Sequence, residues 1–261
     1  MKYTIAVLRN GEIIAEDTGE DYAGLFFDGE YIPGDCIEVK AEDAGCFAYV
    51  QLDDATGADL CLLKSHNYRY EIPFGEKKTG MSPKAFSGNK HLLYVKSAKE
   101  HEIYAYRNLA VNIYDNHEND ALYPHAYANV ETRNEAVFAA RNAIDGNTEN
   151  RSHGEWPYES WGINRNPNAE MTVDLGCEAI VDKIILYTRA DFPHDSWWTQ
   201  ATITFSDNSE MVVDMQKSTA PHEFTFSPIK TSKVTLSKLI KADDESPFPA
   251  LSQIEIYGKI Q

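Results

Sequence analysis

The sequence predicts an all-β protein built from two β-sandwich domains. Short segments in which apolar residues alternate with polar ones, or run together, recur along most of the 261 residues. Turn-forming pairs such as Asn10-Gly11 and Pro33-Gly34 separate these segments. About eight strands of this kind precede residue 108, and that number and spacing are typical of a sandwich.

The first domain is predicted to span residues 1–108. Further turn signals lie at Ile32–Asp35, at Asp53–Gly57 and at Phe74-Gly75. The strands predicted between the turns are Tyr3–Arg9, Gly11–Ala15, Cys36–Lys40, Phe47–Leu52, Leu60–Leu63, Tyr68–Ile72, Leu92–Val95 and Ile103–Tyr106. No motif in this half points to a particular chemistry, so the sequence assigns it no function.

The second domain is predicted over residues 132–261, after a connector at residues 109–131. The connector contains Tyr114, Tyr123 and Tyr127 and is rich in Asn, Asp and His, unlike a flexible Gly/Ser linker. We therefore expect it to pack against one or both domains. The strands predicted in the second domain are Met171–Leu175, Lys183–Tyr187, Ala201–Phe205, Met211–Met215, Glu223–Phe226, Lys233–Leu236 and Gln253–Tyr257.

One helix is predicted, over Asn134–Arg141. Thr132 and Glu135 stand three residues apart immediately before an apolar stretch, which is the spacing of a capping box. The helix would open the second domain.

The composition excludes several classes of function. The formal net charge of -17 disfavours nucleic-acid binding, because phosphate backbones would be repelled. No apolar run of about 18 residues is present, so we expect no membrane insertion. The start of the chain does not resemble a signal peptide, which predicts a cytoplasmic protein, or a secreted one if the chain is a piece of a longer precursor. Reduced thiols are expected at the four cysteines, Cys36, Cys46, Cys61 and Cys177.

The segment Arg189–Trp198 concentrates residues suited to binding a sugar. It contains Arg189, Asp191, His194, Asp195, Trp197 and Trp198. Indole rings stack on the apolar face of a pyranose, and charged groups hydrogen-bond its hydroxyls. The alternative is that both Trp side chains cap the end of a sandwich while the charged groups pair with one another. We expect one Trp to contact ligand and the other to belong to the core.

A second aromatic loop precedes this segment in the chain. All four Trp residues lie between positions 156 and 198. We expect His153, Trp156 and Tyr158 to meet the Arg189–Trp198 segment at one end of the second sandwich. Trp161, by contrast, is expected to pack in the core.

A turn after the predicted helix has the residues of a cation site. Asp145, Asn147 and Asn150 offer oxygen atoms one to three residues apart, around Gly146. Such spacing suits a hard cation such as Ca²⁺. The alternative is an Asx-turn in which Asp145 binds backbone N–H groups without a metal.

Residues 134–258 resemble the coagulation factor V/VIII type C, or discoidin, family, which includes the family-32 carbohydrate-binding modules and is galactose-binding-domain-like. The segments that carry the likeness, in family order, are Asn142–Asn147, Met171–Gly176 with Val181–Ile184, and Gln253–Gly258. The resemblance implies a jelly-roll sandwich and a structural Ca²⁺. Its ligands would be the carbonyls of Asn142, Asn147 and Ile254, the side chain of Asp145, Glu255, and Asn150 in place of the family's Thr. The family's following Trp is absent, so the adjacent loop is rebuilt.

The sequence thus predicts a non-catalytic carbohydrate-binding protein with a mono- or oligosaccharide as its partner. A homo-oligomer or a partner enzyme would be compatible with this role. No hydrolase, metalloprotease or nucleotide-binding motif is present. The alternatives are a protein-interaction module and, with less support, a glycosidase or lyase that uses Asp191, Asp195 and His194.

Overall fold

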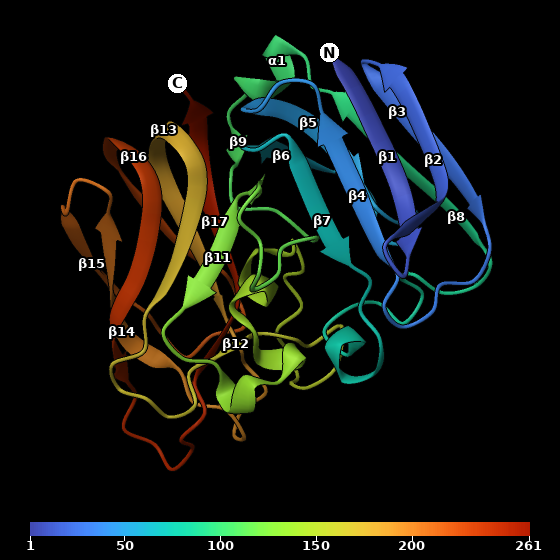
Figure 1. Cartoon of the computed structure of the whole chain (residues 1–261). Helices are drawn as coiled ribbons and strands as arrows, with labels where there is room; N and C mark the ends of the chain where they lie inside the picture. The colour runs from blue at the N-terminus through green and yellow to red at the C-terminus, as the bar shows by residue number, and fades with distance from the viewer.

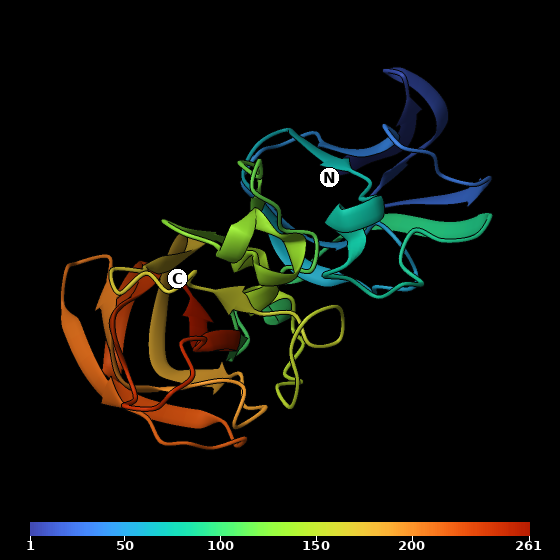
Figure 2. The same cartoon turned by 90° about the horizontal axis from the view of Figure 1, so that it is seen from below.

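The computed structural model describes residues 1–261 and contains two β-sandwiches with separate hydrophobic cores (Figures 1 and 2). Strands account for 48% of the residues and helices for 7%, which confirms the all-β prediction. The N-terminal core gathers residues between Tyr3 and Leu122, and the C-terminal core gathers residues between Leu109 and Ile256. None of the helical segments has the length and hydropathy that a membrane-spanning helix needs.

The N-terminal sandwich consists of two antiparallel sheets. Alternate residues of β3, namely Ala23, Leu25 and Phe27, are buried, as expected for a strand with one face on a core. The order of the first sheet is β2 (Glu12–Glu20), β1 (Lys2–Arg9), β4 (Cys36–Ala41) and β7 (Asn67–Glu71). The order of the second is β10 (Leu122–Tyr123), β6 (Asp59–Leu63), β5 (Cys46–Gln51), β8 (Lys90–Ser97) and β3 (Tyr22–Asp28). A 3-10 turn, η1 (Gly75–Lys78), and a single helical turn, α1 (Glu100–Ile103), lie in the connections.

The C-terminal sandwich is formed by one long antiparallel sheet that curls around its core (Figure 1). Its two longest strands change register, for example between Asp174 and Ala179 in β13, and such bulges bend a strand. The order of the sheet is β12 (Trp161–Gly162), β17 (Ala250–Ile260), β13 (Met171–Thr188), β16 (His222–Lys241), β14 (Trp198–Phe205) and β15 (Glu210–Asp214). Two short strands extend it: β9 (Arg107–Asn108) pairs with β17, and β11 (His125–Ala128) pairs with β13.

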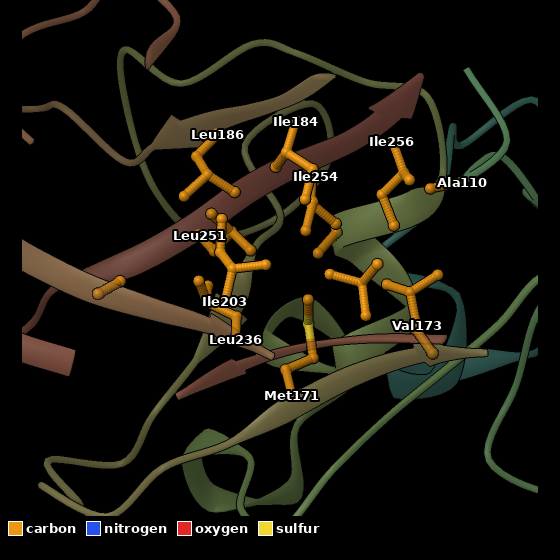
Figure 3. Packing of buried hydrophobic residues seen from close by; sticks show 14 of the residues in the cluster. Ala110, Met171, Val173, Ile184, Leu186, Ile203, Leu236, Leu251, Ile254 and Ile256 are labelled. Carbon is orange, nitrogen blue, oxygen red and sulfur yellow. The ribbon is translucent and has the colours of Figure 1, made fainter. Parts of the chain in front are cut away.

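The core of the C-terminal sandwich is aliphatic. Figure 3 shows Ile184, Leu186, Ile254 and Ile256 from β13 and β17 pointing toward Met171 and the other buried side chains around them. The residues between them, Ile185 and Glu255, are not part of this core, as expected for strands whose successive side chains point to opposite faces of the sheet. Trp161 and Trp198 close one part of this core, with exposed fractions of 0% and 1%.

The connector contributes to both cores. Leu109 and Ala110 belong to the C-terminal core, whereas Tyr114 and Leu122 belong to the N-terminal one. Figure 1 shows this green segment between the two sandwiches. The connector therefore packs into both sandwiches. Moving the sandwiches apart would expose its apolar side chains to water, which is unfavourable.

Two predicted elements are wrong. The helix expected over Asn134–Arg141 is replaced by three 3-10 turns: η2 (Thr132–Asn134), η3 (Ala136–Phe138) and η4 (Ala140–Ile144). Arg133 and Asn134 have positive φ angles of 53° and 54°, and no side chain caps the turns, so a helix cannot propagate. The strand expected over Ile103–Tyr106 is also wrong, because the helical turn α1 ends at Ile103.

Candidate functional site

Three loops meet at one end of the C-terminal sandwich. They are the loop between β13 and β14, the segment that follows Asp145, and the loop between β16 and β17. Backbone hydrogen bonds join them: the N–H of Ala190 donates to the carbonyl of Asn150 at 2.7 Å, and the N–H of Ala242 donates to that of Trp197 at 2.9 Å. The two aromatic loops singled out in the sequence therefore lie together, as predicted.

The exposed part of this end is a stack of planar side chains. The ring of His153 lies on the ring of His194 with 4.2 Å between centroids, and His194 lies on Phe248 at 5.8 Å. The guanidinium of Arg165 covers Phe248 at 4.6 Å. Nδ1 of His153 is also hydrogen-bonded to a carboxyl oxygen of Asp191. Both imidazoles reach solvent, with side-chain exposed fractions of 39% for His153 and 51% for His194.

A buried ion pair between Arg189 and Asp195 lies beneath the stack. Arg189 is 4% exposed, and its Nη2 donates to Oδ1 of Asp195 and to the carbonyl of Phe248. Burial, together with the neighbouring Asp191, raises the pKa of Asp195 to about 8. Burial acts in the same direction on Asp191, but hydrogen bonds from Asp195 and His153 outweigh it and hold its pKa below the ordinary value. The two carboxyls therefore share one proton at neutral pH.

Three residues that were predicted to contact ligand are buried instead. Trp198, at 1% exposure, packs beside Trp161 in the core with 6.4 Å between ring centroids, so it cannot stack on a sugar. The side chains of Arg189 and Asp195 are likewise covered and bind each other. They position the loop instead of facing solvent. The strand β14 begins at Trp198, which turns this indole inward.

Trp197 is the aromatic side chain of the pair that remains at the surface. It is half-buried and packs edge-on against Phe192, with 6.0 Å between centroids. Nζ of Lys217 lies 4.6 Å from the ring centroid of Phe192 and 5.2 Å from that of Trp197. This aromatic pair with a cation beside it is on the same loop as His194, and it offers an apolar surface bordered by hydrogen-bond donors.

The structure places Trp156 elsewhere. Its backbone N–H donates to the carbonyl of Thr79 in the N-terminal half at 2.9 Å, and its ring is 42% exposed. It lines a cleft of about 530 Å³ between the sandwiches, together with Lys84 and Arg141. Tyr158 is half-buried in the same loop segment. The prediction that Trp156 joins the His153 and His194 surface is therefore wrong, because the loop crosses toward the N-terminal domain after Gly154.

A carboxyl pair stands at the predicted cation turn. The N–H of Asn147 donates to Oδ1 of Asp145 at 2.8 Å, and the side chain of Asn147 donates to Oε1 of Glu159 at 2.8 Å. Burial and the negative charge of Glu159 raise the pKa of Asp145 well above its ordinary value. The second oxygen of Glu159, which is 3% exposed, accepts no hydrogen bond from an N–H or hydroxyl group, and the two carboxyls are hydrogen-bonded to each other. This oxygen-rich pair has the donor chemistry of a hard-cation site.

The other predicted cation ligands have different partners. The side chain of Asn142 donates to the carbonyls of Ala136 and Ser160, and that of Asn150 donates to the carbonyls of Thr188 and Thr219. Glu255 accepts a hydrogen bond from the hydroxyl of Tyr187 at 3.4 Å. Ile254 is a buried core residue whose carbonyl lies in the β13–β17 ladder.

Four residues of these sites were not predicted from the sequence: Glu159, Arg165, Lys217 and Phe248. The last three are far from Arg189–Trp198 along the chain, and each reaches it only through the curled sheet. Nothing in their local sequence marks them. Glu159 had a signal, since it lies in the aromatic loop that precedes Trp161.

Residues 126–246 match the model of the F5/8 type C domain, which confirms the resemblance predicted for the C-terminal half. Similar solved structures include the family 32 carbohydrate-binding module of C. perfringens NanJ in complex with galactose, at 22% identity over 51% of this chain and 91% of that one, with a TM-score of 0.39. Chitosan-binding module 1 of a chitosanase/glucanase from Paenibacillus sp. IK-5 is 20% identical over 58% and 98%, with a TM-score of 0.41. The lectin domain of lectinolysin complexed with Lewis B antigen is 21% identical over 57% and 94%, with a TM-score of 0.42. The comparison with curated proteins gives no match.

Proposed function

We propose that this protein binds carbohydrate without cleaving it, at the loop end of its C-terminal sandwich. One observation carries the proposal. Half-buried Trp197 stands on the same loop as His194, which is exposed beside His153 and Asp191, in a segment that matches the F5/8 type C domain. Sugar recognition combines two kinds of group. An indole stacks on the sugar ring, and imidazole and carboxylate groups hydrogen-bond its hydroxyls.

The burial of Asp195 supports a non-catalytic role. A glycosidase needs two carboxyl groups that both reach the substrate, roughly 5 to 10 Å apart across the scissile bond. The side chain of Asp195 has an exposed fraction of 0% and binds Arg189. Of the two carboxyls in this loop, only Asp191 approaches the surface, so the pair cannot flank a bound sugar.

Substituting Trp197 is expected to remove sugar binding. A glycan array followed by calorimetry should show wild-type dissociation constants on the order of 0.1–1 mM, as for a single shallow site. Loss of the stacking surface in Trp197→Ala should weaken binding at least tenfold, about 1.4 kcal/mol. Trp156→Ala is the matched control, because it removes an exposed indole from the interdomain cleft. Absence of any sugar ligand, or equal losses in both variants, would contradict the proposal. A protein partner lost only in Trp156→Ala would favour the interaction module instead.

We propose, in addition, that the Asp145 turn holds a structural Ca²⁺ through Asp145, Asn147 and Glu159. Two carboxyl groups and an amide supply oxygen ligands, and the ion would neutralise a pair that has no cationic side chain bound to it. When bound, such an ion would tie the turn after η4 to the segment that precedes Trp161. Glu159 takes the place that the sequence resemblance gave to Glu255.

Calcium is expected to raise the melting temperature of the wild-type protein by about 5 °C or more when its concentration reaches a hundred times the dissociation constant. Glu159→Gln should abolish this shift, because it removes one of two negatively charged ligands. Glu255→Gln should retain it. A melting temperature that neither excess chelator nor added Ca²⁺ changes would count against the site, and loss of the shift in Glu255→Gln alone would restore the original ligand set.

A further inference from the structure

Two carboxyl oxygens beneath the histidine stack are buried and accept no hydrogen bond from an N–H or hydroxyl group. They are Oδ1 of Asp191 and Oδ2 of Asp195, and Asp195 as a whole is 1% exposed. Buried carboxyl oxygens are almost always paired, because removing them from water is costly. The proton that the two carboxyls share is what joins them, and a divalent cation bound by both carboxylates would take its place.

The nearby imidazole completes a set of three ligands. One side-chain ligand atom from each of His153, Asp191 and Asp195 lies within 4.8 Å of the other two. Imidazole nitrogen and carboxylate oxygen bind Zn²⁺ at about 2.0–2.2 Å, which places the ligand atoms of one tetrahedral ion about 3.4 Å apart. Small side-chain rotations therefore bring the three atoms around a single ion. The set spans two loops, so an ion here would cross-link them.

The surroundings of Asp195 orient it for this role. Arg189 donates to Oδ1 of Asp195 and leaves Oδ2 free, and it is itself fixed by the carbonyl of Phe248. Hydrogen bonds of this kind to a ligating carboxylate are a regular feature of metal sites. The exposed side chain of His153 gives an ion access from solvent and leaves a coordination position open to water.

We propose that His153, Asp191 and Asp195 bind a divalent transition-metal ion of the zinc class. The mixed nitrogen and oxygen donors favour such an ion over Ca²⁺, which takes oxygen ligands alone. The site is separate from the Asp145 turn, and it does not depend on sugar binding.

The experiment is a titration of the metal-stripped full chain with Zn²⁺ by calorimetry, without sugar. One equivalent is expected to bind, and His153→Ala and Asp195→Asn should each lower the affinity at least tenfold. Co²⁺ in place of zinc should give visible d–d absorption that His153→Ala removes. His117→Ala is the matched control, since it removes an exposed histidine that is also bonded to a carboxylate, Glu131.

Three results would overturn the proposal: no bound zinc, an affinity unchanged in both site variants, or an equal loss in His117→Ala. His153 is exposed, so its substitution should leave the melting temperature in chelator unchanged. That variant therefore separates loss of a ligand from loss of the fold. A protein that binds zinc but no glycan would leave this site standing while rejecting the proposed function.

Discussion

Trp198→Ala is expected to lower the free energy of unfolding of the C-terminal domain by about 3–5 kcal/mol. The indole is 1% exposed and packs beside Trp161, so its removal leaves a large cavity in a core that cannot collapse around it. Urea unfolding followed by circular dichroism measures the change, with the transition of the C-terminal domain analysed by itself because the two sandwiches need not unfold together.

The adjacent residue supplies the control for this prediction. Trp197→Ala removes the same side chain from a half-buried position and should cost much less stability while it abolishes sugar binding. Trp198→Phe should cost less than about 1.5 kcal/mol, because it keeps most of the ring and removes an indole N–H that has no partner. If Trp197→Ala were the more destabilising of the two alanine variants, the assignment of inner and outer indoles would be reversed.

Arg189→Ala is expected to destabilise the same domain by about 3 kcal/mol or more. The guanidinium donates to Asp195 of the buried carboxyl pair, and its loss leaves that carboxyl and the carbonyl of Phe248 without this donor. Thermal and urea unfolding of the single variant would measure this effect.

A double variant tests the reason for this loss. Arg189→Met combined with Asp195→Leu replaces both partners by apolar side chains and should recover much of the stability, because no uncompensated charge remains. Arg151→Ala breaks an exposed pair with Glu149 in the neighbouring loop and should cause no measurable change. If Arg189→Ala and Arg151→Ala changed the free energy of unfolding equally, burial of the Arg189–Asp195 pair would contribute nothing to stability.

Most strands were predictable because one face of each is buried. β1 and β4 were expected within a residue of their observed ends, since apolar residues that are buried make up most of both strands. The edge strand β3 was missed, because Phe26 is apolar yet 59% exposed and obscures the alternation. The helix predicted near Asn134 failed because capping-box spacing is a weak local signal, and here the left-handed conformations of Arg133 and Asn134 exclude a helix.

The residue types of the site could be predicted from the sequence, but the orientation of their side chains could not. The two loops that carry His153 and His194 could be identified from their aromatic and charged residues, and they do meet. Which indole faces outward depended on where β14 begins, because a shift of one residue along a strand exchanges the buried and exposed sides. Trp156 left the predicted surface because its backbone bonds to Thr79 of the other sandwich, a contact that no local pattern reports.

Residue type and periodicity were enough to predict that this protein is all-β, that its C-terminal half resembles the F5/8 type C domain, and that two loops rich in aromatic and charged residues meet. These properties follow from side-chain periodicity and residue type, which act locally along the chain. The folded chain was needed to show that Trp198 and Arg189 are buried beneath the loop, that Glu159 pairs with Asp145, and that Phe248 joins the histidine stack. Burial and pairing decide those roles, and both depend on which segments the curled sheet brings together.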